Sequence, residues 1–327
     1  MNSIPQSDVS GQPLDLTSAP TLSQTTLFTA LFRSVAFFLV GVVALLVAYI
    51  FSQGFHGLNP AFLFGSATSQ DSSGMFDVHN AGVFEMVFGT ILLVFLMTVL
   101  VMPVGVISGI YLNEFSDPNA WTTRIIRSAV NNLAGVPSII FGLFGLGFFV
   151  YFIGGSIDDY VLHTASPVFG KPAVIWAALT LAVLTMPVVV VSTEQALRSV
   201  PLPLRDAALG LGATKLQTLR QIVLPQAAPG IITGGILAVS RGAGEVAPIM
   251  FTGAAYYLAH LPQSITDQFM ELGYHIYILA TQSPNVDRTR PLLFATVVVL
   301  LLLTFLLNLI AILVRAWTRH RMRSYRA

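Results

Sequence analysis

The sequence predicts an all-α integral membrane protein with six transmembrane helices. Of its 327 residues, 54% are hydrophobic and only 9% are charged, and the mean hydropathy is +0.76. Soluble domains carry about 25% charged residues, so this composition excludes an ordinary soluble protein. A helix needs about 20 predominantly apolar residues to cross a bilayer. Six segments meet that requirement, and we place them at residues 35–51, 84–112, 133–153, 173–192, 227–250 and 291–314.

The residues outside these spans form short segments. Residues 1–34 are a polar N-terminal tail without a basic segment ahead of a short apolar core, so we expect no cleaved signal peptide. Residues 35–314 are expected to form one transmembrane domain with a polar loop at 193–226, and 315–327 a basic C-terminal tail. The longest segments between spans have roughly 30–40 residues, too few to bury an independent core. A soluble catalytic domain is therefore excluded.

Lys and Arg are distributed unequally between the two sides of the predicted membrane. The side that holds the termini and the 193–226 loop has twelve of them, namely Arg33, Arg124, Arg127, Arg198, Arg205, Lys215, Arg220, Arg315, Arg319, Arg321, Arg323 and Arg326. The other side has three, which are Lys171, Arg288 and Arg290, and Arg241 lies inside a span. Cytoplasmic segments carry the excess of basic residues. We therefore expect both termini and the loop in the cytoplasm, and residues 52–83, 154–172 and 251–290 outside.

The polar loop is predicted to contain two short helices separated by glycines. Asp206 lies near the N-terminus of the first helix, which Gly210 and Gly212 end. Thr214 is expected to cap the second helix, and Pro225 to end it. Such a pair can lie on the inner leaflet as amphipathic helices. The first helix contains the small residues Ala207, Ala208 and Gly210, which favours docking into the groove of another protein instead.

This loop resembles the EAA loop of ABC importer permeases, which has an acidic residue, Ala-Ala, three residues, Gly, nine residues and Ile-x-Leu-Pro. The matching residues are Asp206, Ala207, Ala208, Gly212, Ile222, Leu224 and Pro225, with Asp206 where Glu is usual. The resemblance implies that they couple the chain to a separate ATPase, and Arg198 just ahead of them serves either this contact or the substrate pathway. No Gly-x-x-x-x-Gly-Lys-Ser/Thr sequence occurs, so the chain has no nucleotide-binding P-loop of its own.

Two charged residues, Arg241 and Glu245, fall within the fifth predicted span. A charge at the centre of a membrane helix costs roughly 2.5–3.5 kcal/mol on insertion scales, so both need partners or a wet pathway. At positions i and i+4 they can pair with each other. Alternatively, the guanidinium fork of Arg241 can bind the oxygens of a tetrahedral oxyanion in a bidentate manner. Glu245 would then hold Arg241 in place or accept a hydrogen bond from a protonated oxyanion.

The sequence around these charges resembles the phosphate permeases of the PstA family. The resemblance extends roughly over residues 85–325 and depends most on the string Ser-Arg-Gly-Ala-Gly-Glu-Val-Ala-Pro-Ile-Met-Phe-Thr at 240–252 and on Ala-Gly-Val-Pro-Ser at 134–138. It implies the six-helix, MetI-like architecture of type I ABC importer permeases in a bacterial inner membrane. It also implies a substrate pathway lined by Ser240, Arg241, Glu245 and Thr252.

The resemblance further implies a set of partners: a homologous second permease subunit, two copies of a cytoplasmic ABC ATPase, an external phosphate-binding protein and membrane lipid. The chain itself is expected to hydrolyse nothing and to bind neither nucleic acid nor a cofactor. With no cysteine, and no partner at metal-ligand spacing for the histidines of the external loops, we expect no metal site. The alternatives are a permease for sulfate or molybdate, and a membrane scaffold that reports phosphate status without moving it.

Two structural expectations complete the prediction. Gly105 with Gly109, and Gly230 with Gly234, have the small-xxx-small spacing of packed membrane helices. Asp158 and Asp159 are expected together in a solvated external turn.

Overall fold

The computed structural model describes residues 22–66, 82–164, 166–258, 260–283 and 285–324. Helices account for nearly all the regular structure in these ranges, and a parallel bridge joins Ala254 to Phe269. The chain divides into two compact units, residues 1–52 and 53–327. An all-helical membrane protein with six apolar spans is confirmed, because six helices within the described ranges are long and apolar enough to cross a bilayer.

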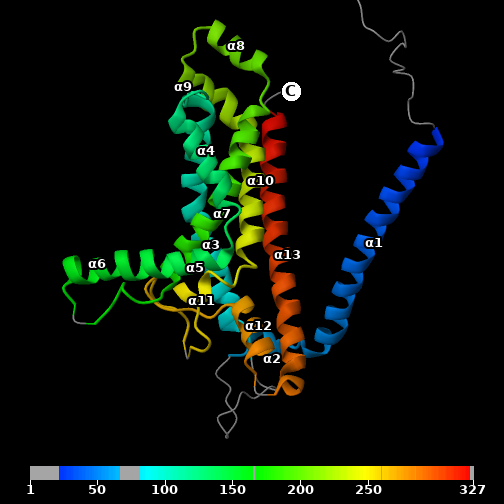
Figure 1. The fold of residues 1–327 in the computed structure, drawn as a ribbon, viewed down its shortest axis with the longest axis vertical. Coiled ribbons are helices and arrows are strands. Elements are labelled where there is room, and N and C mark those ends of the chain that lie inside the picture. The colour runs from blue at the N-terminus through cyan, green and yellow to red at the C-terminus, as the bar shows by residue number, and fades with distance from the viewer. Residues whose placement is uncertain (1–21, 67–81, 165, 259, 284, 325–327) are drawn as a thin grey trace, which may run out of the picture. The chain divides into compact units, whose positions relative to one another are not determined.

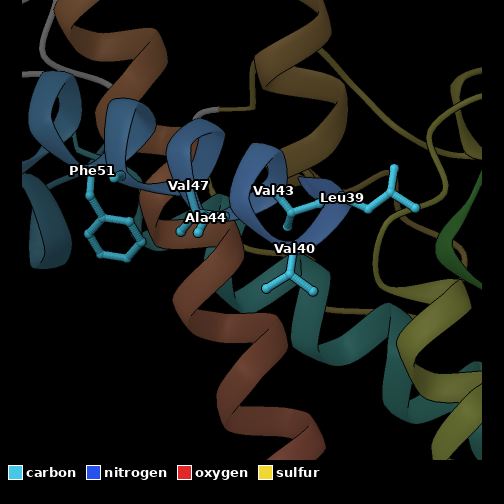
Figure 2. Close-up of a pocket in the computed structure, with 7 residues that line it drawn as sticks. Leu39, Val40, Val43, Ala44, Val47 and Phe51 are labelled. Carbon is cyan, nitrogen blue, oxygen red and sulfur yellow. The ribbon is translucent and has the colours of Figure 1, made fainter. Parts of the chain in front are cut away.

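The first unit consists of helix α1 (Leu22–Gly54), whose last two residues belong to the second unit. The helix begins shortly after Pro20 and so includes part of the predicted polar tail, since no proline or glycine interrupts residues 22–34. Residues 1–21 of that tail lie outside the described ranges. Figure 2 shows a shallow hollow along one face of α1, lined by Leu39, Val40, Val43, Ala44, Val47, Ala48 and Phe51. Because every lining side chain is apolar, this hollow provides no group that could bind an anion.

The second unit contains the other helices. Around its first long helix are η1 (Phe55–Gly57), α2 (Pro60–Phe64), α3 (Phe84–Ile110), η2 (Tyr111–Phe115) and α4 (Trp121–Leu133). The middle of the chain forms α5 (Ser138–Phe144), η3 (Gly145–Gly154), α6 (Gly155–Ile157), η4 (Asp158–Leu162), α7 (Val174–Arg198) and α8 (Leu202–Gly210). The remainder forms α9 (Lys215–Thr218), η5 (Leu219–Val223), α10 (Leu224–Gly242), α11 (Ile249–Thr252), α12 (Leu272–Thr281) and α13 (Val286–Ser324).

Helices α3, α7, α10 and α13 run side by side in the second unit, with α7 in contact with both α3 and α10 (Figure 1). Helices α8 and α9 lie at one end of this bundle, and α2 and α12 at the other; we call these the α8 end and the α12 end. The helical segment from α5 to α6 starts beside the bundle and projects sideways from it in Figure 1, and its α5 and η3 parts contact α7. Helix α7 is the centre of the bundle, since 67% of its most apolar 18 residues are buried, a larger share than in the other candidate spans of the described residues.

Glycines allow the helices of the bundle to approach closely. A Cβ atom on Gly105 or Gly109 of α3 would lie 2.7 Å from side-chain atoms of Val189 or Thr193 on α7. On α10, a Cβ on Gly230 would meet the Cβ of Ala196 at 2.5 Å, and one on Gly234 the Cβ of Ser192 at 2.6 Å. The predicted packing role of both glycine pairs is confirmed. Without a hydrophobic driving force inside a bilayer, such close van der Waals packing is what holds helices together.

Substitution of Gly109 by valine should destabilise the bundle. The added side chain would also meet the carbonyl oxygen of Val190 at 3.0 Å, which is backbone and cannot rotate away. Overpacking of this kind costs about 1–3 kcal/mol. We expect a lower midpoint of thermal unfolding in detergent for Gly109→Val than for Gly147→Val, because nothing lies within 4 Å of a Cβ at Gly147. Equal midpoints for the two variants would contradict the packing assignment.

The boundaries of the third and last spans differ from those expected. The third candidate span covers Ser138–Leu162, and residues before it form the separate helix α4. Pro137 accounts for the break, because proline disfavours helical backbone at the residue before it and is accepted at the start of the next helix. At the C-terminus, α13 continues to Ser324, so most of the predicted basic tail is helical; residues 325–327 lie outside the described ranges.

The expectation that Pro225 ends a helix is wrong. Residues Lys215–Gly242 form one continuous helical span, and Pro225 lies in the first turn of α10. The π-helical segment η5 (Leu219–Val223) directly precedes it. The wider π turn accommodates the proline, because its ring would otherwise clash with the carbonyl group four residues earlier.

Asp158 is also placed differently from the expectation. It is 4% exposed, and its carboxylate accepts hydrogen bonds from the backbone N–H groups of Val168 (2.9 Å), Phe169 (3.0 Å) and Gly170 (2.7 Å). Only its neighbour Asp159 is exposed. Asp158 thus fastens the segment before α7 to the end of the third span. An acidic pair in sequence gives no sign of this, because the three donors are backbone groups of a later segment.

Candidate substrate pathway and coupling loop

The fifth span is interrupted where its charged residues occur. Helix α10 ends at Gly242, and the N–H groups of Gly244 and Glu245 make turn contacts with the carbonyl groups of Arg241 (3.3 Å) and Gly242 (3.4 Å). A short helix, α11, begins after Pro248. Glu245 therefore lies in a non-helical segment, 243–248, and not on a continuous helix through 227–250 as expected. We call this segment the α10–α11 break.

Arg241 and Glu245 form an ion pair across the end of α10. The guanidinium Nε lies 3.5 Å from the Oε1 atom of Glu245, and the two side chains are 33% and 20% exposed. A cation in the last turn of a helix is favoured by the unsatisfied carbonyl groups there. Of the two alternatives that the sequence leaves open, mutual pairing is present in this structure. The role of Arg241 as an anion contact stays a prediction.

The other two predicted pathway residues lie in different surroundings. Ser240 donates a hydrogen bond to the Oδ1 atom of Asn308 on α13. Thr252 is completely buried, and its hydroxyl donates to the carbonyl oxygen of Pro248 at 2.9 Å. The structure thus brings Arg241 and Glu245 together, places Ser240 at the contact between α10 and α13, and places Thr252 in the core. Asn308 was missed by sequence reasoning, although a lone amide in the apolar last span is a signal that could have found it.

Helix α3 contacts α10 beside the charged pair. Met97 is fully buried, and its sulfur would lie 2.4 Å from a Cβ atom added to Gly242. Gly242 follows Arg241 directly. The position of α3 therefore limits the position of the α10–α11 break.

The polar loop at 193–226, which we call the coupling loop after its predicted role, has the predicted helix-glycine-helix form. Gly212 has φ +87°, a left-handed conformation that side chains other than glycine rarely adopt. Thr214 and Gln217 then form a capping box at the start of α9. Of the predicted coupling residues, Asp206, Ala207, Gly212 and Pro225 are exposed, Ile222 and Leu224 are half-buried, and Ala208 is buried.

Large apolar side chains of the loop are exposed at the α8 end. They are Leu202 (69%), Leu204 (39%), Leu209 (48%), Leu211 (91%) and Leu216 (64%). Contiguous exposed apolar groups next to polar ones mark interaction surfaces. We call these five leucines the loop leucines.

Arg198 is tied to the bundle by two side chains. Its Nη2 lies 3.2 Å from the Oε2 atom of Glu194, and its Nε donates to the Oδ1 atom of Asn113 at 3.2 Å. Glu194 also pairs with Arg127 of α4, at 3.5 Å. Sequence reasoning missed this cluster, because its members come from η2, α4 and α7. It joins the ends of three helices at the α8 end.

A buried acid and a buried imidazole lie at the α12 end. Glu271 caps α12, because its carboxylate accepts a hydrogen bond from the N–H of Tyr274 at 2.6 Å. Its carboxylate and the side chain of Val246, in the α10–α11 break, both lie close to Gly273, where an added Cβ would meet them at 3.1 and 2.8 Å. Burial raises the pKa of Glu271 to about 7, although hydrogen bonds from Gly273, Tyr274 and Thr90 oppose the shift. Burial lowers the pKa of His275 to about 4. Sequence reasoning missed both residues.

Replacement of Glu271 by glutamine should stabilise the protein at alkaline pH. Because the folded-state pKa is raised from 4.5 to about 7, the ionised acid costs stability above pH 7, and this cost disappears as the pH falls toward 4.5. We expect Glu271→Gln to exceed wild type by up to about 3 kcal/mol at pH 8 and by progressively less toward pH 5. The effect of His275 is common to both proteins and cancels. A difference that does not change with pH, measured by thermal unfolding in detergent, would contradict the assignment.

Comparison with known proteins identifies the family. Residues 102–324 match the family described as "Binding-protein-dependent transport system inner membrane component". The chain belongs to this family. It is therefore an ABC importer permease, a membrane subunit without an ATPase site of its own.

Relatives of this permease include proteins named as phosphate permeases. It is 32% identical over 226 residues to "Probable ABC transporter permease protein YqgI" of Bacillus subtilis (strain 168), with 69% of each chain covered. It is 33% identical over 190 residues to "Phosphate transport system permease protein PstA" of Xylella fastidiosa (strain 9a5c), covering 58% of this chain and 61% of that one. With "PstA 1" of Mycobacterium tuberculosis (strain CDC 1551 / Oshkosh), it shares 34% over 169 residues, 52% of this chain and 50% of that one. The permease thus matches about half to two thirds of the length of these PstA relatives.

Solved structures confirm the fold of the permease. It covers 94% of a chain of the inward-facing MetNI methionine ABC transporter, with 72% of its own length, a TM-score of 0.52 and 22% identity. It covers 93% of a chain of the bacterial alginate ABC transporter in complex with an alginate-bound periplasmic protein, with 88% of its own length, a TM-score of 0.59 and 14% identity. The predicted architecture of type I ABC importer permeases is therefore confirmed.

Proposed function

We propose that this permease forms half of the translocation pathway of an ATP-driven importer of inorganic phosphate. The observation that carries the proposal is the Arg241–Glu245 pair, which lies where the fifth candidate span ends at the α10–α11 break and within the sequence string that resembles phosphate permeases. The similarity to proteins named PstA supports phosphate as the substrate. Ionisable side chains at membrane depth are rare because they are costly, and they commonly mark ion pathways.

In this proposal, phosphate takes the place of the Glu245 carboxylate beside Arg241. A pair separated by 3.5 Å is longer than a strong charge-assisted hydrogen bond of about 2.8 Å, so an anion can compete for the guanidinium. The positive charge lowers the barrier for an anion in a low-dielectric channel. When Glu245 binds Arg241 again, it helps to release the ion, and permeation requires such weak binding. Ser240 and Thr252 act as supports, through Asn308 and the fold of α11.

The coupling loop is proposed to dock on a cytoplasmic ABC ATPase. The exposed loop leucines and the matched residues of the loop support this role. The proposed assembly contains a homologous second permease, two ATPase copies and an external phosphate-binding protein. The α8 end and both termini then face the cytoplasm, the α12 end faces outward, and the protein lies in a bacterial inner membrane. Residues 1–34, 35–314 with the loop 193–226, and 315–327 keep the domain roles expected from sequence.

The proposed function is tested by uptake of radiolabelled phosphate into proteoliposomes that hold the complete complex and ATP. We expect uptake that requires the binding protein and ATP, and that excess sulfate or molybdate does not reduce. Competition by either anion would favour a permease for another oxyanion. ATP hydrolysis that phosphate-loaded binding protein stimulates, without uptake, would favour a signalling scaffold.

A further inference from the structure

Arg205 of α8 contacts the ends of two long helices with one side chain. Its Nη1 lies 2.7 and 2.9 Å from the two carboxylate oxygens of Glu114, in η2 at the end of α3. Its Nη2 donates to the carbonyl oxygen of Leu197 near the end of α7, at 2.7 Å. Helix α8, which we call the coupling helix, is thereby attached to both α3 and α7.

This contact is suited to holding a fixed geometry. The Arg205 and Glu114 side chains are 18% and 8% exposed, so solvent and salt screen their attraction less than that of a surface pair. The planar guanidinium restricts rotation about the contact more than an ammonium group does. Among the ion pairs of the described residues, Arg205–Glu114 is the one that includes a residue of α8. The Arg198–Glu194 pair, in contrast, joins two residues of α7.

The contact continues along α3 to the charged pair of the α10–α11 break. Glu114 lies in η2, which extends α3 without interruption, so a displacement of this end moves the helix that carries Met97. Met97 packs on Gly242, the neighbour of Arg241. Two tertiary contacts, joined by the continuous helix α3, therefore connect α8 with Gly242, the neighbour of Arg241.

We propose that Arg205 and Glu114 are positioning residues that transmit the movement of the coupling helix to α3, and through Met97 to Arg241. The proposal rests on the proposed function of the coupling loop. It assigns Arg205 a role inside the permease, on the side of α8 that faces the bundle. The ATPase contact belongs to the exposed loop leucines.

The first test measures transport and ATP hydrolysis together in the reconstituted complex. The variants are Arg205→Gln, Glu114→Gln and the exchanged double variant Glu114→Arg/Arg205→Glu, with Arg124→Gln as the control that removes an exposed basic charge of α4. We expect each single variant to keep the ATPase bound during purification and to hydrolyse ATP, but to move roughly tenfold less phosphate per ATP, the loss expected for a charge-assisted contact. The exchanged variant should recover part of the ratio, and Arg124→Gln should match wild type.

Three outcomes would overturn the proposal: an unchanged ratio in both single variants, loss of the ATPase from the complex in Arg205→Gln, or an exchanged variant no better than the single ones. The second outcome would make Arg205 a docking residue. If the wild-type complex moves no phosphate, the proposed substrate is wrong. The role of Arg205 and Glu114 in transmission is then tested by a second measurement.

That measurement needs no substrate. The native chain has no cysteine, so spin labels can be placed at Gly210→Cys on α8, where nothing lies within 4 Å of a Cβ, and at Ile107→Cys on α3; both positions are exposed and neither is a loop leucine. In the complex with the Arg205–Glu114 pair intact, we expect one narrow distance distribution with and without trapped nucleotide, because the two helices move together. In Arg205→Gln the distribution should broaden or shift when nucleotide is trapped. Identical distributions in the two proteins would overturn the proposal.

Discussion

Replacement of Arg241 by alanine is expected to abolish phosphate uptake by the assembled importer. The substitution removes a guanidinium that can make two charge-assisted hydrogen bonds to one anion, each worth about 1.5–3 kcal/mol. Loss of both corresponds to a decrease of at least roughly 100-fold in uptake. Arg241→Lys retains the charge but not the fork, so we expect it to lose most of the uptake as well. The measurement is the initial rate of radiolabelled phosphate uptake at equal amounts of complex.

Arg241→Ala could also lose uptake because the complex becomes unstable, and this effect must be separated from the loss of an anion contact. The alanine leaves Glu245 without its partner, and an unpaired carboxylate in a half-buried site costs stability. The double variant Arg241→Ala/Glu245→Gln removes both charges and should restore any lost assembly while uptake stays absent. Arg124→Ala serves as the control for loss of an exposed arginine. Uptake close to wild type in Arg241→Ala would show that the arginine is a packing element.

Substitution of Gly212 by valine is expected to weaken binding of the ATPase to the coupling loop and so to reduce phosphate uptake. The left-handed backbone conformation of Gly212 costs a residue with a side chain roughly 1–2 kcal/mol, and a β-branched residue more. The turn between α8 and α9 would therefore rearrange. We expect at least a tenfold fall in ATPase retained by the purified permease and in uptake, corresponding to about 1.4 kcal/mol of lost docking. Both quantities can be measured on the same preparation.

Two control variants isolate the backbone effect of Gly212. Asparagine tolerates the left-handed region, so Gly212→Asn should keep most of the activity. Gly210→Ala tests a helical glycine nearby, where nothing lies within 4 Å of a Cβ, and should behave like wild type. If Gly212→Val binds ATPase and transports normally, the conformation of this turn has no part in coupling.

The spans and the loop could be predicted from sequence because their signals are local. Apolar length located the six candidate spans, and turn chemistry at Gly212 and Thr214 located the two loop helices. The path of the fifth span was harder to foresee. Its glycines and Pro248 are compatible with either a weakened helix or a break. In the structure, the break is in contact with other helices, because Gly242 packs against Met97 and Val246 against Gly273.

The missed site residues share a physical cause. Arg205 pairs with Glu114 across 91 positions of the chain, and Glu271 is buried by segments from α3 and the α10–α11 break. Such partners are brought together by tertiary packing, which one sequence does not specify. Charges at i and i+4, such as Arg241 and Glu245, could be paired in advance because their spacing is local.

The continuous helix from Lys215 to Gly242 is longer than the hydrocarbon core of a bilayer is thick. Its 28 residues give a rod of about 40 Å at 1.5 Å per residue, and the hydrocarbon core of a bilayer is about 30 Å thick. Some 10 Å of the rod therefore exceeds the thickness of the lipid tails, and in the proposed orientation this excess lies at the end that starts in the coupling loop. If the helix moves as one rod, a tilt of a few degrees about its loop end displaces Arg241, at its other end, by roughly 2 Å.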